Sequence, residues 1–184
     1  MIKLMVTDFD GTLVDTFEAN LRAYQKAFAD VGLQLTSEDY RRCFGFRFER
    51  FMASMGIFDQ KIGDKIRDSK KKYYPEFFSH LKVNVPLVEL ISTFHKLGGK
   101  TAIASTARRE NLENALQHAG LHSLFDLIIA GEDVKQGKPS PEIYETVMER
   151  MEVSPYETLI YEDSEVGLQS AKASKAHFMK TEII

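Results

Sequence analysis

Residues 3–15, KLMVTDFDGTLVD, begin with a short apolar run and end in acids and a glycine. A continuous apolar run of this length is typical of a strand buried on both faces. In an open α/β sheet, ligands bind at the carboxyl ends of such strands, which is where Asp8 and Asp10 stand here. A surface turn is the simpler alternative, since Asp-Gly is a common turn dipeptide. A calcium-binding EF-hand loop is excluded, because Leu13 and Ala19 stand where it needs glycine and an acid.

The composition of the 184 residues is that of an ordinary globular protein, with 43% hydrophobic and 28% charged residues. The net charge of −3 and the lack of a basic stripe give no reason to expect a nucleic-acid partner. No apolar stretch approaches the roughly 20 residues of a membrane span, and no signal peptide is recognisable. The single cysteine, Cys43, fits a reducing compartment and is expected to be buried rather than nucleophilic. We therefore expect a cytoplasmic monomer or weak homodimer that binds neither membranes nor nucleic acid.

The segment between Asp15 and about Val83 has helical patterns and almost no strand signal. Its many phenylalanines and tyrosines are expected to form a core of their own rather than a binding platform. The predicted helices cover 16–31, 36–45, 48–55 and a polar stretch through Arg67 to Tyr74.

From Pro86 onward, helices alternate with short apolar strands. Ser140 is predicted to cap the helix that ends at Met151, with Pro141 as its first helical residue. The alternation predicts βαβ units and therefore a parallel sheet with helices on both faces. The predicted fold class is α/β, a Rossmann-like parallel sheet core (1–14 and 84–184) with an all-helical cap (15–83) inserted after the first strand. The later strands are predicted at 100–104, 126–130, 158–161 and 177–181.

Polar clusters follow three of the predicted strands. They are Asp8 with Asp10, then Ser105–Thr106, then Glu162–Asp163. Because the carboxyl ends of parallel strands lie at one edge of a sheet, these clusters are expected to converge. Lys138 lies in the sequence between the second and third of these clusters, just before a predicted helix start. Carboxylates, a hydroxyl and a lysine around one crevice indicate a magnesium-assisted phosphoryl-transfer site, because acids bind hard cations and positive groups neutralise phosphate.

These residues resemble, in order, the four signature motifs of the haloacid dehalogenase-like (HAD) hydrolases. The stretch 8–15 (DFDGTLVD) is similar to the first motif, Ser105 to the second, Lys138 to the third and 162–164 (EDS) to the fourth. The resemblance runs from the first strand to the last helix and covers nearly the whole chain. Any one of the last three motifs is weak alone, but four in order, each on the predicted element, are specific. The resemblance implies a Mg²⁺-dependent phosphatase of a small phosphorylated metabolite, of the sugar phosphate or phosphoglycolate type.

The resemblance also implies a role for each motif residue. Asp8 would be the nucleophile that forms an aspartyl-phosphate, and Asp10 would be the general acid and then the general base. Mg²⁺ would be bound by the carboxylates of Asp8 and Asp163 and the backbone carbonyl of Asp10, with Glu162 joining directly or through water. Lys138 would balance the charges of the phosphate and the nucleophile.

Substrate contacts are implied in two places. The Ser105 hydroxyl and the Thr106 amide would hold phosphate oxygens. The helical insertion is similar to the cap that relatives close over the site, and Arg47 stands in its substrate-facing loop. Arg47 is a candidate contact for a second polar end of the substrate, and Arg108 and Arg109 are comparable candidates. Ordinary exposed arginines are the alternative for all three.

Three other functions stay open. A phosphomutase of the beta-phosphoglucomutase type would use the same motifs, although Asn20 and Thr12 stand where the mutase has histidine and valine. A 2-haloacid dehalogenase would lack an acid at the position of Asp10, since a halide leaves without a proton. A non-catalytic binding module would have lost a catalytic group, whereas Asp8, Asp10, Lys138 and Asp163 are all present.

Overall fold

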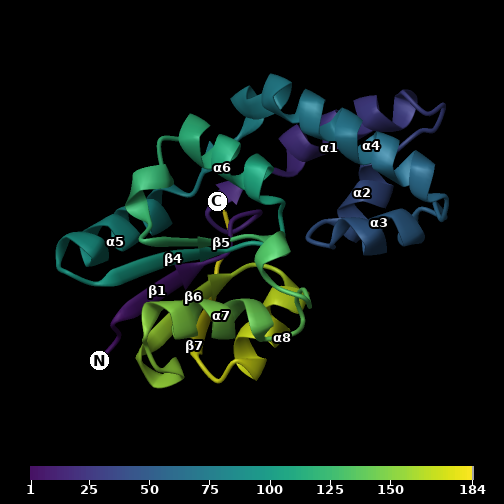
Figure 1. Ribbon diagram of the computed structural model, residues 1–184. Coiled ribbons are helices and arrows are strands. Elements are labelled where there is room, and N and C mark those ends of the chain that lie inside the picture. The colour runs from purple at the N-terminus through teal and green to yellow at the C-terminus, as the bar shows by residue number, and fades with distance from the viewer. Residues whose placement is uncertain (184) are drawn as a thin grey trace. The chain divides into compact units, whose positions relative to one another are not determined.

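The computed structural model describes residues 1–183 and contains two compact units (Figure 1). An α/β unit is formed by Met1–Asp15 together with the chain from Lys82 onward, and a helical unit by Thr16–Leu81. The two connections between the units, β2 (Val14–Asp15) and β3 (Lys82–Val83), pair as an antiparallel ribbon. The sequence predicted neither strand. The helical unit is therefore slightly shorter than the 15–83 expected from the sequence.

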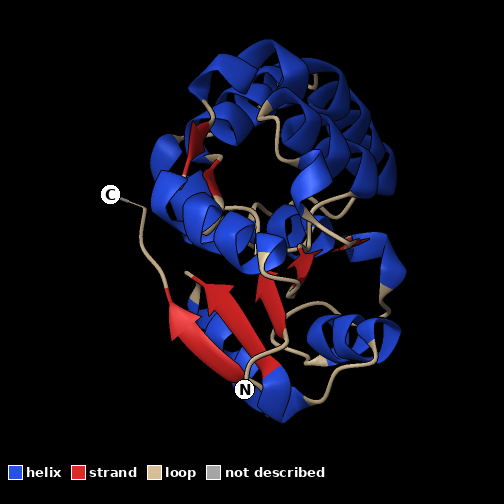
Figure 2. Ribbon diagram, turned by 90° about the vertical axis from the view of Figure 1, so that its left-hand side faces the viewer, coloured by secondary structure: helices blue, strands red, loops and turns tan. Residues whose placement is uncertain are grey.

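A five-stranded parallel sheet is the centre of the α/β unit, which confirms the predicted fold class. The strand order is β5-β4-β1-β6-β7, so β1 lies in the middle and is paired on both sides. Its residues Leu4 and Val6 are fully buried, and the common direction of the strands is visible in Figure 2. The strands are β1 (Leu4–Thr7), β4 (Lys100–Ala104), β5 (Leu127–Ile129), β6 (Thr158–Glu162) and β7 (His177–Lys180).

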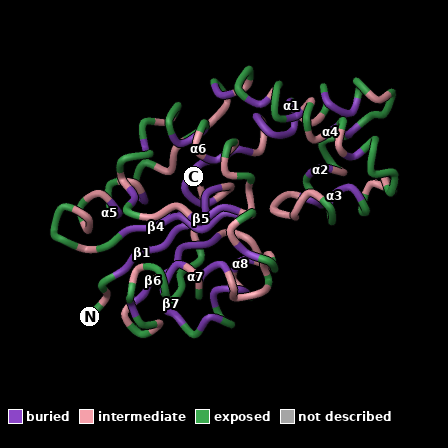
Figure 3. Tube along the Cα trace, in the orientation of Figure 1, coloured by how far each residue is buried: buried purple, intermediate pink, exposed green. Residues whose placement is uncertain are grey.

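Helices cover both faces of this sheet (Figure 1). The helices α5 (Val85–Lys96) and α6 (Arg109–His118) lie on one face, and α7 (Glu142–Met151) and α8 (Glu165–Ala173) lie on the other. Right-handed crossovers between parallel strands lead to this two-sided arrangement. The edge strand β7 is exposed along its length, whereas the inner strands are buried (Figure 3).

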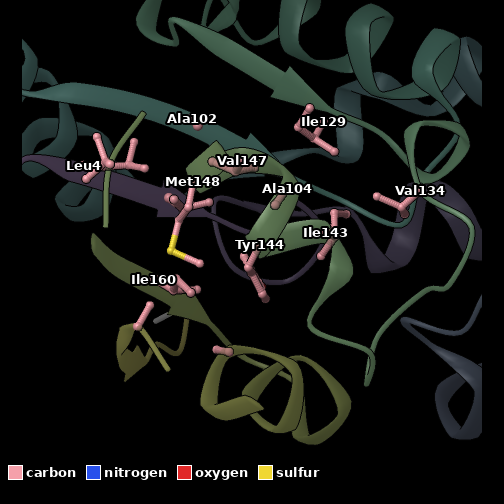
Figure 4. Packing of buried hydrophobic residues seen from close by; sticks show 14 residues of the cluster. Leu4, Ala102, Ala104, Ile129, Val134, Ile143, Tyr144, Val147, Met148 and Ile160 are labelled. Atoms are coloured by element: carbon pink, nitrogen blue, oxygen red, sulfur yellow. The ribbon is translucent and has the colours of Figure 1, made fainter. Parts of the chain in front are cut away.

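The core between the sheet and α7 is built from alternate strand residues. Leu4 and Val6 of β1 belong to the same buried cluster as Ala102 and Ala104 of β4, because residues two apart on a strand share a face. Figure 4 shows the side chains that α7 contributes to this cluster. They are Ile143, Tyr144, Val147 and Met148.

The predicted start of α7 was wrong by one residue. The helix begins at Glu142, and Pro141 occupies the N-cap position that was expected for Ser140. The cause is a preceding turn, in which the Ser140 N–H donates to the Gly137 carbonyl at 3.1 Å. The Ser140 hydroxyl still accepts a hydrogen bond from the Glu142 N–H, at 3.3 Å.

The helical unit has an aromatic core. Phe51 packs against Tyr24, Phe28 and Tyr40 with ring centroids 5.0 to 5.9 Å apart, and it is only 3% exposed. The prediction that these aromatics form a core is therefore confirmed. The helices of this unit are α1 (Phe17–Ala29), α2 (Ser37–Cys43), α3 (Phe48–Ser54) and α4 (Gln60–Tyr73).

The remaining helical segments are 3₁₀ turns. The α-helices are short: α4, with 14 residues, is the longest of those given above. Within residues 1–183, none of the helices combines the length and apolar character that a membrane span requires. The 3₁₀ segments are η1 (Tyr74–His80), η2 (His122–Leu124), η3 (Gly131–Asp133) and η4 (Pro155–Glu157).

Candidate active site

The register of the sheet brings three strand ends together. Thr7, the last residue of β1, pairs with Ile103 of β4 on one side and with Tyr161 of β6 on the other. The polar residues that follow these three strands therefore meet at one edge of the sheet. Asp8 is the first residue after the central strand, and its N–H donates to the Tyr161 carbonyl at 3.0 Å.

Lys138 joins the first and last motifs. Its Nζ donates to Asp8 Oδ1 at 2.6 Å, to Glu162 Oε1 at 2.5 Å and to the Ala104 carbonyl at 3.1 Å. Burial lowers the pKa of Lys138, but the charges of Asp8 and Glu162 outweigh burial, so that its pKa lies well above the ordinary value. Lys138 is therefore a fixed positive charge held against the Asp8 carboxylate.

Asp8, Glu162 and Asp163 form an acidic cluster in which one oxygen of each lies within 4.8 Å of the others. Burial raises the pKa of Asp8 against the charge of Lys138, and the neighbouring carboxylates raise it further. Burial also raises the pKa of Asp163, against a hydrogen bond from Thr12. Three carboxylates beside one lysine leave an excess of negative charge in a place shielded from water. Carboxylate oxygens at this spacing fit a hard divalent cation.

Gly11 makes room for Asp163. Its φ is +86°, and a Cβ at this position would lie 2.4 Å from Asp163 Oδ2. The Thr12 hydroxyl donates to the other oxygen, Asp163 Oδ1, at 2.7 Å. Asp10, immediately before Gly11, forms an isolated β-bridge with Val14 that closes this loop.

Ser105 is buried directly after β4, with an exposed fraction of 1%. Its N–H donates to the Ile129 carbonyl at 3.0 Å, and its hydroxyl accepts a hydrogen bond from the Ala107 N–H at 3.1 Å. Thr106 follows, and a Cβ at Gly131 would lie 2.5 Å from the Thr106 carbonyl oxygen. The backbone therefore fixes the turn that carries both of these predicted phosphate-binding residues.

The three arginines considered as substrate contacts differ in placement. Arg109 is held by ion pairs to two carboxylates of its own unit and by a hydrogen bond to the Ile128 carbonyl. Arg108 has a side chain 52% exposed, and its Nε lies 3.9 Å from Glu132 Oε1. Arg47 belongs to the helical unit, where it directly precedes α3.

Sequence reasoning missed Tyr144. Its hydroxyl donates to Glu162 Oε1 at 2.6 Å, and Lys138 Nζ lies 5.1 Å from its ring centre. The side chain is fully buried in the core cluster under α7. The only signal was a tyrosine on the apolar face of that helix, because a buried tyrosine hydroxyl normally has a hydrogen-bond partner.

Comparison with known proteins identifies the family. The family described as haloacid dehalogenase-like hydrolase matches residues 5–180. The chain belongs to this family. The resemblance read from the four motifs is thereby confirmed, and the protein is a hydrolase.

The relatives and solved structures include several named phosphatases. A phosphorylated carbohydrates phosphatase of Thermotoga maritima is 33% identical over 178 residues, which cover 94% of this chain and 82% of that protein. The fructose-1-phosphate phosphatase YqaB of Escherichia coli is 25% identical over 174 residues, which cover 92% of this chain and 91% of that protein. The crystal structure of CbbY from Rhodobacter sphaeroides in complex with phosphate matches with a TM-score of 0.90 at 26% identity. The match covers 99% of this chain and 87% of that one.

Proposed function

We propose that this hydrolase is a Mg²⁺-dependent phosphatase that cleaves a small phosphorylated carbohydrate through an aspartyl-phosphate on Asp8. The observation that carries the proposal is the 2.6 Å contact between Asp8 and Lys138 inside the acidic cluster. A carboxylate held against a fixed positive charge is suited to attack an anionic phosphate ester. The names of two relatives, a phosphorylated carbohydrates phosphatase and a fructose-1-phosphate phosphatase, support the substrate class.

The proposed metal ligands are the carboxylates of Asp8 and Asp163 and the backbone carbonyl of Asp10, with Glu162 in the same cluster. The excess negative charge of the cluster supports this assignment. When bound, Mg²⁺ supplies positive charge that polarises the phosphate and stabilises charge in the transition state.

The proposed reaction has two steps, both on residues of this chain. A carboxylate oxygen of Asp8 attacks phosphorus, the bond between phosphorus and the ester oxygen breaks, and Asp10 protonates the leaving alcohol. Asp10 then takes a proton from water, which attacks the same phosphorus and releases inorganic phosphate and the free Asp8 carboxylate. The Ser105 hydroxyl and the Thr106 N–H hold phosphate oxygens, and Lys138 offsets their charge.

We further propose that the helical unit acts as the cap that selects the substrate. Arg47 of this unit and Arg108 of the α/β unit are the proposed contacts to the sugar or to a second anionic group. Arg109 is a poorer candidate, since its guanidinium is already held by two carboxylates. The proposed setting is the cytoplasm, with the protein as a monomer or weak homodimer.

Phosphate release tests this function. Purified protein with Mg²⁺ is incubated with a panel of sugar phosphates, phosphoglycolate, nucleotides and an aryl phosphate. We expect inorganic phosphate from at least one sugar phosphate, and Asp8→Asn should abolish release while the protein still unfolds cooperatively. Release of chloride from 2-haloacids would favour a dehalogenase, and no turnover of any substrate would favour a binding module.

A phosphomutase is the second candidate function. A structure described as a putative beta-phosphoglucomutase from Thermotoga maritima is 28% identical with a TM-score of 0.71, covering 96% of this chain and 84% of that one. Asn20 and Thr12 count against this activity, as the sequence indicated. Conversion of a sugar 1-phosphate into its isomer without release of free phosphate would replace our proposal with the mutase.

A further inference from the structure

Glu162 differs from the other two acids of the cluster, because protein donors already occupy both of its oxygens. Oε1 accepts hydrogen bonds from Lys138 and Tyr144, at 2.5 and 2.6 Å. Oε2 accepts from the N–H groups of Asp163 and Ser164, at 3.1 and 3.4 Å, and from the Ser164 hydroxyl at 3.3 Å. A carboxylate offers about four lone-pair positions in total. These five donors therefore saturate Glu162, which is fully buried.

Gly167 provides the space in which the Glu162 carboxylate lies. A Cβ at position 167 would be 2.0 Å from both Cδ and Oε1 of Glu162. Gly167 lies in the first turn of α8, within a regular helix, where glycine is unfavourable on propensity grounds. Room for the carboxylate is therefore the physical reason for a glycine at this position.

Tyr144 holds the same carboxylate from a different helix. It comes from α7, where Figure 4 shows its ring among apolar side chains of the core. Among residues 1–183, Glu162 is the one hydrogen-bond partner of the Tyr144 hydroxyl. Leaving a buried hydroxyl without a partner is costly, so this contact fixes the tyrosine and the glutamate together.

We propose that Tyr144 is a positioning residue that, with the space at Gly167, holds Glu162 as the permanent counter-ion of Lys138. Asp8 and Asp163, but not Glu162, are then the cluster carboxylates that bind the metal. The inference rests on the proposed phosphatase function, and it divides the three clustered acids between two tasks.

This arrangement matters most when Asp8 carries the phosphoryl group. The Asp8 carboxylate has then become an acyl phosphate and no longer offers Lys138 the same carboxylate partner. Glu162 stays in place, because Tyr144 and the start of α8 hold it independently of Asp8. Lys138 therefore remains charged and correctly placed for the hydrolysis of the intermediate.

The test begins with Tyr144→Phe, which removes one oxygen and keeps the buried ring. We expect kcat for an aryl phosphate to fall about tenfold, as for other groups that orient a site residue, with KM unchanged. When Tyr144→Phe is added to Glu162→Gln, we expect no further fall in kcat. The effects of substituting two residues in contact are not additive when both act through the same hydrogen bond. The matched control is Tyr161→Phe, a buried tyrosine on β6 that neighbours Glu162 and whose kcat should not change. Equal kcat values for the Tyr144 and Tyr161 variants would overturn the inference.

Metal binding tests the other half of the inference without substrate. Calorimetry with Mg²⁺ on metal-free protein should show that Asp163→Asn loses at least about tenfold in affinity. Tyr144→Phe should stay within about threefold of the parent, and Glu162→Gln should lose clearly less affinity than Asp163→Asn, since it removes a nearby charge but not a ligand. Loss of affinity in Glu162→Gln equal to that in Asp163→Asn would overturn the proposal. Absence of phosphatase activity with this binding pattern intact would instead count against the proposed function alone.

Discussion

Gly11 and Gly167 each stand where a side chain would collide with a carboxylate of the acidic cluster. At Gly11 the obstacle would be Asp163 Oδ2, and at Gly167 it would be the carboxylate of Glu162. The two residues therefore shape the site by what they lack. Gly11 also has a φ of +86°, a conformation that glycine adopts with little strain.

Gly11→Ala tests this role at the first motif. The new Cβ would displace Asp163, so we expect the Mg²⁺ affinity to fall about tenfold or more. The left-handed backbone should also cost about 1–2 kcal/mol of stability. Calorimetric metal titration and thermal unfolding measure the two effects separately.

Gly120→Ala is the matched control for this substitution. Gly120 has a φ of +69°, and a Cβ there would have nothing within 4 Å. It should therefore show a similar loss of stability without any change in metal affinity. An equal loss of metal affinity in both variants would mean that backbone strain, rather than contact with Asp163, is responsible.

Single elements of the helical unit depend on their caps. The Thr36 hydroxyl accepts a hydrogen bond from the Asp39 N–H at 3.0 Å and donates to Asp39 Oδ2 at 2.6 Å. Together these bonds close the start of α2, which has only seven residues. A helix this short gains little from its own hydrogen bonds, so its cap and its packing decide its stability.

Thr36→Ala should lower the free energy of unfolding by about 1 kcal/mol, the usual effect of removing an N-cap side chain. Urea denaturation followed by circular dichroism measures this difference. Thr36→Ser keeps the hydroxyl and should stay close to the parent. Equal destabilisation by serine and alanine would show that the methyl group, not the cap, matters here.

The same cap governs a titration. Hydrogen bonds from Thr36 and Arg42 lower the pKa of Asp39 below its ordinary 3.8. A carboxylate whose pKa is lower in the folded than in the unfolded protein stabilises the fold. This stabilisation is present above the pKa of the unfolded state and is lost as the pH falls through the pKa of the folded state. Thr36→Ala should therefore raise the pKa of Asp39 toward 3.8, as measured by NMR of the side-chain carboxyl. Glu157, whose pKa is lowered by Lys3, should titrate unchanged in the variant.

At the scale of the whole molecule, the β2–β3 ribbon allows the helical unit to be an insertion. Asp15 and Lys82 are paired directly opposite each other where the chain leaves and rejoins the α/β unit. Adjacent ends of this kind let an inserted unit fold without disturbing the sheet that carries it. The motif residues Asp8, Ser105 and Lys138 all belong to the α/β unit.

Replacement of residues 16–81 by Asn-Gly should convert this ribbon into a two-residue hairpin. We expect the shortened protein to unfold cooperatively and to keep its Mg²⁺ affinity within about threefold, because the proposed ligands lie outside the deletion. Its preference among sugar phosphates should disappear, since the proposed cap is gone. Loss of metal binding in a protein that still unfolds cooperatively would contradict the assignment of the site to the α/β unit.

The sequence by itself determined the fold class and the set of motif residues. Strand β4 was predicted at the bounds that the structure gives, because a buried apolar run is a local signal. The meeting of Asp8 with the ends of β4 and β6 was also predictable, since parallel strands end at one edge. Family membership follows from the same motifs and is confirmed by the match over residues 5–180.

Only the tertiary structure decided how the clustered side chains are engaged. The hydrogen bond from Tyr144 to Glu162 joins residues 18 positions apart on different elements, and no local pattern indicates it. The β2–β3 ribbon was missed because two-residue strands have no measurable periodicity. Side-chain contacts of this kind depend on how α7 and α8 pack on the sheet, and packing is set by the whole chain rather than by any single stretch.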